Sequence, residues 1–368
     1  MIDKKFQSRF HWPLFWTLIG LCAISLVNLH SATYNLTKGG ISSFVWSQGL
    51  WIGLGLLLGA LLLFIDYRLW IRFSYPVYFV TLVLLLLVVF FGKTVGGNRN
   101  WLVIGGLNLQ PAELAKISLV IAFARFFSDN PPGRSSYQLI ELVRPGIMAL
   151  LPIVLIVLGK DMGSALFFIF LSASLFAFAG IQRKVVLILS VLLLISGIVS
   201  YKFVLSPHQK SRIEAFLHPS EDTRGEGYHL LQSKITVGSG RVFGKGYLQG
   251  MHSKLLYLPE RHTDFIFPVL AEEWGWVGSF FTLFLYATLI SFGLQIASKA
   301  RERFGIFLGL GISAILFWQV VINLGGVLGL IPLTGVTLPI LSYGGSSVVT
   351  ILIGISFLMN ISMRRFMF

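Results

Sequence analysis

Residues 73–92 read FSYPVYFVTLVLLLLVVFFG, a stretch without one charged side chain. About 20 apolar residues in helical conformation are enough to cross the hydrocarbon core of a bilayer. A backbone in lipid must satisfy its own hydrogen bonds, so only helices and closed barrels span membranes. The length and continuity of this stretch predict a membrane-spanning helix.

The rest of the chain repeats this pattern. Apolar runs of similar length lie at 13–32, 44–65, 111–128, 143–160, 162–181, 184–205, 265–297, 304–331 and 342–362. Charged residues interrupt the run at 111–128, and prolines interrupt the run at 143–160. The sequence therefore predicts an all-α polytopic membrane protein with ten transmembrane helices, forming a single membrane domain over 1–368.

The composition agrees with this fold class. Hydrophobic residues make up 55% and charged residues 12% of the chain, whereas soluble domains carry about 25% charged residues. The net charge of +14 comes from short basic clusters between apolar runs, which favours contact with anionic lipid headgroups over nucleic acid. Cys22 is the only cysteine, and no metal-binding motif is evident, so neither a disulfide nor a metal site is indicated.

Basic side chains also predict the orientation of the chain. They gather at the N-terminus, at the C-terminus and in alternate short loops, which the positive-inside rule places in the cytoplasm. We therefore expect both termini to be cytoplasmic and the first apolar run to be a retained helix. The long polar segment 206–264 is then a large extracytoplasmic loop.

The segment LPERHTDFIF, residues 258–267, ends this loop and runs into an apolar span. It places Asp264 where water meets lipid. A carboxylate at such a boundary costs free energy unless it is paired or partly solvated, so its presence calls for a chemical reason. We interpret Asp264 as a general base in an enzyme that acts on a lipid-linked substrate.

Three further acidic or basic residues in or beside predicted spans are candidates for a substrate cavity. Glu113 and Lys116 lie three residues apart and so share one helix face, where they form either a structural ion pair or a polar wall of a substrate cavity. Asp161 lies between two spans, where it either caps a helix or faces the same cavity.

Several polar motifs have structural alternatives. The glycine-rich run from Gly238 to Gly246 could approach a phosphate, but a flexible turn explains these residues as well. Glu272 and Glu273 lie inside a predicted span, and we expect one of them to pair with a cation. The small residues of 342–347 allow either close helix packing or substrate contact.

Four stretches together carry a family resemblance. They are Gln110–Lys116, Gly227–Ser233, Leu258–Phe267 with Glu272 and Glu273, and Pro339–Ser347. In this order, over nearly the whole chain, they resemble the SEDS family, the membrane glycosyltransferases of shape, elongation, division and sporulation. The resemblance is strongest to the elongation branch, RodA, and weaker to the division branch, FtsW.

The resemblance implies ten membrane helices and polymerisation of peptidoglycan from lipid II in the bacterial cytoplasmic (inner) membrane. It implies that the essential aspartate is Asp264 and that Glu113, Lys116 and Asp161 are polar cavity residues. The leaving pyrophosphate needs positive charge or hydrogen-bond donors. The candidates are Lys116, Arg212, Lys245 and Lys254. No cofactor is certain, although a divalent cation could do the same work.

The resemblance also implies partners, namely a class B penicillin-binding transpeptidase and, in the elongation complex, MreC and MreD. Two positions depart from the family pattern: Asn100 stands before Trp101 where arginine is common, and Arg241 stands where glycine is usual. Charges within spans fit a lipid II flippase or a transporter of lipid-linked sugars equally well. A non-catalytic scaffold is the third alternative, and it would leave Asp264 unexplained.

Overall fold

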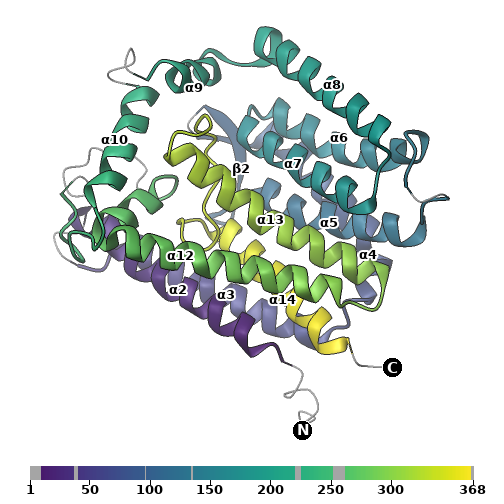
Figure 1. Ribbon diagram of the computed structural model, residues 1–368, viewed down its shortest axis with the longest axis horizontal. Coiled ribbons are helices and arrows are strands. Elements are labelled where there is room, and N and C mark those ends of the chain that lie inside the picture. The colour runs from purple at the N-terminus through teal and green to yellow at the C-terminus, as the bar shows by residue number, and fades with distance from the viewer. Residues whose placement is uncertain are drawn as a thin grey trace.

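The computed structural model of the chain describes residues 10–36, 40–95, 97–133, 136–219, 225–251 and 262–365. Its long helices are α2 (Trp12–Thr33), α3 (Ser43–Phe64), α4 (Leu69–Phe91), α5 (Pro111–Asp129), α6 (Val143–Leu158), α7 (Met162–Ala179), α8 (Arg183–Val199), α12 (Ile266–Ser298), α13 (Arg303–Val327) and α14 (Gly345–Arg364). They pack as one bundle (Figure 1). Within the described residues, nine helical segments are long and apolar enough to cross a membrane. The predicted all-α polytopic membrane fold is confirmed.

The fourth predicted span, 111–128, is helical but is not one of these nine. Helix α5 carries Glu113, Lys116, Arg125 and Asp129, which lower its hydropathy. It packs between α4 and α13, and most of its side chains are buried. Because protein rather than lipid surrounds α5, it can carry polar side chains that a lipid-facing helix could not.

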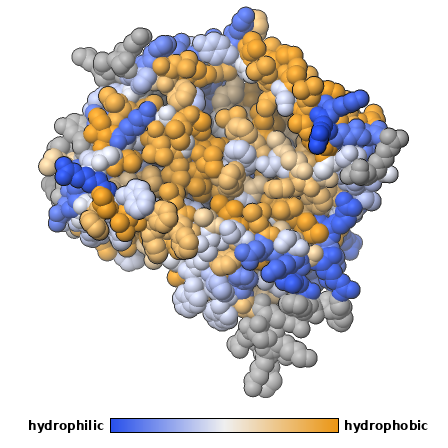
Figure 2. All heavy atoms as spheres, viewed as in Figure 1, coloured by the Kyte–Doolittle hydropathy of each residue, from blue (hydrophilic) through white to orange (hydrophobic). Residues whose placement is uncertain are grey.

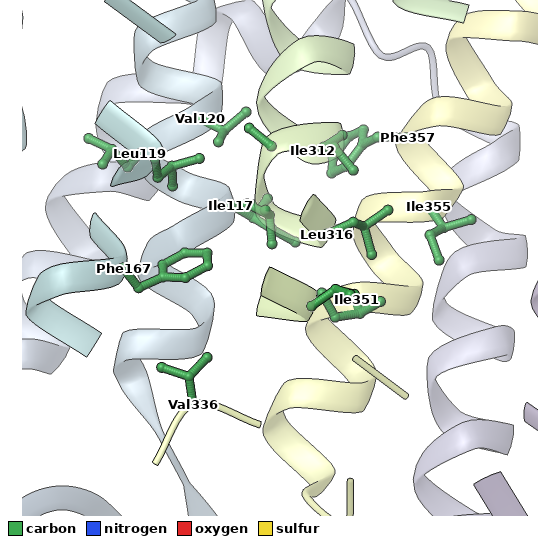
Figure 3. Packing of buried hydrophobic residues seen from close by; sticks show 14 of the residues in the cluster. Ile117, Leu119, Val120, Phe167, Ile312, Leu316, Val336, Ile351, Ile355 and Phe357 are labelled. Atoms are coloured by element: carbon green, nitrogen blue, oxygen red, sulfur yellow. The ribbon is translucent and has the colours of Figure 1, made fainter. Parts of the chain in front are cut away.

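The apolar core is centred on α13. Leu308, Ile312 and Leu316 are almost completely buried on this helix. Figure 3 shows Ile312 and Leu316 of α13 between Ile117 of α5 and Ile351 of α14. In lipid, burying an apolar side chain does not gain the free energy of the hydrophobic effect. This close packing therefore holds the helices together mainly through dispersion contacts.

Helix α8 contrasts with α13. It lies along the outside of the bundle, at the top of Figure 1, and Val185 is the only buried residue described for it. Apolar side chains cover much of the face of the bundle shown in Figure 2, while hydrophilic ones gather toward its edges. This distribution is what a helix bundle in a bilayer requires.

One end of the bundle carries short elements that the sequence did not predict. Strands β1 (Lys93–Val95), β2 (Asn98–Ile104) and β3 (Leu107–Leu109) form an antiparallel sheet between α4 and α5. The predicted loop 206–264 contains α9 (Pro207–Leu217) and α10 (Glu226–Ser239). Short helical turns complete the chain: η1 (Tyr34–Leu36), η2 (Ile140–Leu142) and the π-helical η3 (Ser200–Val204). Helix α2 begins and α14 ends at the end of the bundle opposite α9 and α10 (Figure 1).

The predicted span 265–297 is interrupted at Gly275. This residue has φ 66° and ψ −161°, a conformation essentially restricted to glycine. It divides α12 into a short buried segment, Ile266–Glu273, and a long segment that continues to Ser298. The predicted span is present as Ile266–Ser298, with a break in the helix at Gly275 that the sequence did not predict.

The glycine-rich run compensates for this break. Backbone amides of Lys245 and Gly246 donate to the carbonyls of Glu272 and Glu273, both at 3.0 Å, and Trp276 donates to Arg241 at 2.8 Å. A Cβ atom on Gly244 would lie 2.1 Å from the Glu273 oxygen, which only glycine avoids. We call residues 240–246 the glycine clasp.

Candidate active site

The segment that carries Asp264 is fixed through its main chain. Asp264 lies in the turn just before α12, and its side chain is partly exposed. The Thr263 carbonyl accepts a hydrogen bond from Ser342 Oγ at 2.7 Å, and the Asp264 carbonyl accepts one from Asn323 Nδ2 at 3.2 Å. Two residues further on, Asn28 Nδ2 donates to the Ile266 carbonyl at 3.0 Å. Donors from α2, α13 and the segment before α14 thus hold the backbone of Asp264 in place.

Asp264 and Arg212 both lie near Gly335. A Cβ atom built on Gly335 would lie 3.6 Å from Asp264 Oδ2 and 3.9 Å from Arg212 Nη1. Both charged groups therefore border the same small volume, although 52 positions separate them in the sequence. Gly335 has φ 74°, the left-handed region that glycine adopts without strain. A carboxylate and a guanidinium that border one volume can accept a proton and bind an anionic oxygen, respectively.

A pocket opens beside Arg212, between the start of α7 and α9. Its polar lining includes Asn98, Gln209, Arg212 and Thr334, and its apolar lining includes Leu166 and Ile331. We call it the α7–α9 pocket. Gln209 Nε2 donates to the Lys160 carbonyl at 2.7 Å and joins the two sides. Because Thr334 precedes Gly335, the pocket ends close to Asp264, which gives a mixed polar and apolar hollow next to a carboxylate.

Glu113 and Lys116 form a buried ion pair. Lys116 Nζ lies 2.7 Å from Glu113 Oε1, and the two side chains are 2% and 6% exposed. Lys116 Nζ also lies 4.5 Å from the centre of the Phe167 ring on α7. Within the described residues, Glu113 Oε2 is buried without a hydrogen-bond partner. Glu113 and Lys116 thus form the ion pair that was one of the two alternatives. Their role in substrate binding stays a prediction.

Asp161 caps α7. Its carboxylate accepts hydrogen bonds from the Ser164 amide at 3.0 Å and from Ser164 Oγ at 2.9 Å. Asn100 Nδ2 of β2 donates to Asp161 Oδ2 at 3.1 Å. The helix-cap alternative is confirmed, and Asn100, one of the two departures from the family pattern, anchors β2 to this cap. The neighbours of Asp161, Lys160 and Met162, line the α7–α9 pocket.

Lys245 pairs with a buried carboxylate. Its Nζ lies 2.6 Å from Glu272 Oε1, and the Glu272 side chain is fully buried. This confirms the expectation that one of the two glutamates pairs with a cation. Lys245 thus lies in the glycine clasp, and its ammonium group pairs with Glu272. Lys254, the other predicted phosphate contact of this loop, lies outside the described residues.

Glu273, the second glutamate, contacts helix α2. Ser31 Oγ of α2 donates to Glu273 Oε1 at 2.5 Å. Beyond the clasp, the Tyr247 hydroxyl and His30 Nδ1 lie 2.7 Å apart. Burial, and secondarily the Glu273 carboxylate, raises the pKa of Tyr247, so Tyr247 stays protonated at neutral pH and can donate to His30. The glycine-rich run is therefore a structural brace of α12 in the described residues.

The small residues of 342–347 hold the site together. Besides its bond to Thr263, Ser342 Oγ accepts from the Leu338 amide at 2.8 Å. Ser347 Oγ lies 3.1 Å from Thr337 Oγ1, and Ser346 Oγ accepts from the Gln110 amide at 3.1 Å. These contacts favour the packing alternative for the run.

Sequence reasoning missed Asn323, Gly335 and Gln209. Asn323 lies within an apolar span, and such a residue in a membrane helix is itself a signal for a specific partner. Gly335 and Gln209 carry no such signal. In the part of the chain that the structure describes, no group of three or more His, Cys, Asp or Glu side chains could hold a metal ion.

Similarity to known proteins extends over almost the whole chain. The family model FTSW_RODA_SPOVE, described as "Cell cycle protein", matches residues 12–366. Peptidoglycan glycosyltransferase MrdB of Escherichia coli (strain K12) is 36% identical over 316 residues, 85% of this chain and 84% of that protein. Stage V sporulation protein E of Bacillus subtilis (strain 168) is 35% identical over 327 residues, 87% of each chain.

Solved structures share the fold. A chain in "Structural coordination of polymerization and crosslinking by a peptidoglycan synthase complex" has a TM-score of 0.83 and 32% identity, covering 97% of this chain and 98% of that one. The rod shape determining protein RodA of Thermus thermophilus has a TM-score of 0.72 and 30% identity, with the same coverage of 97% and 98%.

The fold and the site thus define a multi-pass membrane protein with a carboxylate and a guanidinium at one end of its helix bundle. The chain belongs to the SEDS family, the family of FtsW, RodA and SpoVE.

Proposed function

We propose that this chain is a peptidoglycan glycosyltransferase that polymerises lipid II, with Asp264 as general base. The observation that carries the proposal is the convergence of Asp264 and Arg212 on Gly335 at the edge of the α7–α9 pocket. The names of the similar proteins agree: MrdB is a peptidoglycan glycosyltransferase, and the complex of the solved structure is a peptidoglycan synthase.

The reaction transfers a growing glycan from its pyrophosphate to the next sugar. The acceptor 4-hydroxyl attacks the anomeric carbon, Asp264 takes the hydroxyl proton, and the carbon–oxygen bond to undecaprenyl pyrophosphate breaks. Such general base catalysis is worth about 10²–10⁴-fold. The Arg212 guanidinium stabilises the departing pyrophosphate. An α-linked donor that gives a β-linked product reacts by a single inverting displacement, so no glycosyl-enzyme forms.

The proposal places the α9 and α10 end of the bundle outside the bacterial cytoplasmic membrane and both termini inside. Lipid II headgroups are assembled into peptidoglycan outside the cell membrane. The site must therefore face outward. The common end at which α2 begins and α14 ends supports this orientation. Elongation is the process to which the resemblance assigns the chain. The partners would be a class B penicillin-binding transpeptidase and the elongation proteins MreC and MreD.

The test uses purified full-length protein and lipid II in detergent and in vesicles, with and without the transpeptidase. We expect glycan strands from the wild type and none from Asp264→Asn. Asp129→Asn is the matched control, because Asp129 is exposed at the far end of α5. Equal polymerisation by Asp264→Asn would refute the role of Asp264 as base. Movement of lipid II across vesicles without polymer would instead identify a flippase.

A further inference from the structure

We propose that Asn323 is the positioning residue of Asp264, an inference that rests on the proposed function. Asn323 lies on α13 and its side chain is buried. Its one amide nitrogen donates to two carbonyl oxygens, that of Asp264 at 3.2 Å and that of Val336 at 2.9 Å. It therefore ties the turn that carries the base to the segment that contains Gly335.

The Asp264 carbonyl receives this bond from outside α12. Asp264 precedes Phe265, the N-cap of α12, and Pro268 stands four residues later, at the amide that would otherwise extend the helical hydrogen bonds to Asp264. Proline has no N–H to donate. Asn323 Nδ2 on α13 therefore gives the Asp264 carbonyl a hydrogen bond that α12 does not supply, and it fixes the direction in which α12 starts.

The second bond extends this control to the pocket. Val336 follows Gly335, beside which both Asp264 Oδ2 and Arg212 Nη1 lie. Thr334, on the other side of Gly335, lines the α7–α9 pocket. One side chain thus sets the position of the carboxylate relative to the pocket wall.

Asn323 is retained at a cost in stability. Among the described residues its Oδ1 atom is buried without a hydrogen-bond partner, and an unsatisfied buried polar atom is unfavourable. A leucine of similar size would avoid that cost. The asparagine is therefore better explained by the geometry that its two donor bonds impose.

The experiment compares Asn323→Leu with Asn360→Leu. Asn360 is the matched control, because its Nδ2 also donates to two carbonyls, those of Leu62 at 2.7 Å and Ile65 at 2.6 Å. Asn360 lies near the C-terminal end of α14, whereas Asp264 lies just before the start of α12. The readouts are kcat and KM for lipid II, thermal unfolding, and hydrogen exchange of peptides that contain residues 262–270.

For Asn323→Leu we expect kcat to fall roughly 10- to 100-fold, because a small displacement of a reacting group is costly. KM should stay near that of the wild type, and residues 262–270 should exchange faster. Asn360→Leu should lower thermal stability without either effect. If Asn323→Leu does not fold, Asn323→Ser, which is smaller and still polar, takes its place with the same expectations.

Two results would overturn the inference: unchanged exchange at 262–270, or loss of kcat only in proportion to thermal stability, as in the control. Failure of the proposed function is distinguishable, because it appears in Asp264→Asn with Asn323 intact. Failure of the inference appears in Asn323→Leu with Asp264 intact.

Discussion

Lys245 Nζ lies 2.6 Å from Glu272 Oε1 and closes the glycine clasp over the break in α12. The lysine is 29% exposed, whereas the glutamate is completely buried. Removing the lysine charge would take the Lys245 counterion away from a buried carboxylate, which is unfavourable. The ion pair therefore connects the loop that precedes Asp264 to the helix that follows it.

Lys245→Met should destabilise the protein by about 3 kcal/mol, the lower end for a broken buried pair because the lysine is partly solvated. Lys245→Met with Glu272→Gln should recover most of the loss, since the buried charge is then absent. Cys22 is the only cysteine and is buried, so a thiol-reactive dye reports unfolding on heating. A double variant as unstable as Lys245→Met would contradict the ion-pair explanation.

Gly275→Ala should destabilise the protein by about 3 kcal/mol or more, because alanine is strained at this φ and ψ. Its Cβ would also lie 2.2 Å from the Gly244 amide nitrogen. Gly53→Ala on α3 is the control, because a Cβ there meets nothing within 4 Å. The same thermal assay checks both variants, and equal melting temperatures would show that the break is not needed.

Lys116→Met should cost about 3–5 kcal/mol, because Glu113 would stay buried and unpaired. The double variant Glu113→Gln with Lys116→Met should fold nearly as well as the wild type. Its polymerisation rate then separates structure from chemistry. An inactive but stable double variant would support the predicted role of the pair in substrate binding, whereas full activity would leave the pair a structural role only.

Asp161→Ala should lose about 1 kcal/mol of stability, the usual cost of removing a helix cap. Asp161→Asn should stay close to the wild type, because asparagine also accepts the Ser164 amide hydrogen bond. Comparing KM for lipid II in these two variants tests the predicted substrate contact. A raised KM in the well-folded Asp161→Asn would indicate that the charge binds substrate.

Arg212→Gln should weaken lipid II binding or slow the reaction by about 10-fold or more, the worth of a charge-assisted hydrogen bond. Steady-state kinetics of glycan polymerisation measures the effect. Arg241→Gln is the control, because its side chain is an exposed cation of the glycine clasp. Equal kinetics in the two variants would remove Arg212 from the site.

The sequence predicted those parts of the fold that follow from the need to bury the chain in lipid. Lipid demands long apolar helices, so stretches such as 73–92 identify spans directly. The same argument made Asp264 a candidate site residue, because a carboxylate beside an apolar run is costly. The charges of 111–128 marked this span as unusual, and its burial between α4 and α13 explains why it tolerates them.

The contacts between distant segments were beyond prediction. The pairing of Lys245 with Glu272 was expected only as a glutamate with some cation, since 27 residues separate the partners. The glycine clasp contacts the break in α12 through backbone hydrogen bonds. Because every residue type has the same backbone atoms, the sequence does not predict these hydrogen bonds. For the same reason the sequence did not distinguish Gly335, near which both Asp264 and Arg212 lie, from other glycines.

The hydrogen bonds that hold the Asp264 turn depend on residue type on the donor side but not on the acceptor side. Its acceptors are carbonyl oxygens of Thr263, Asp264 and Ile266, atoms common to every amino acid. Their donors are particular side chains, those of Ser342, Asn323 and Asn28. Substitution at 263 therefore preserves the anchor, whereas substitution at the three donor positions removes it, so residues far away in sequence determine where the Asp264 turn lies.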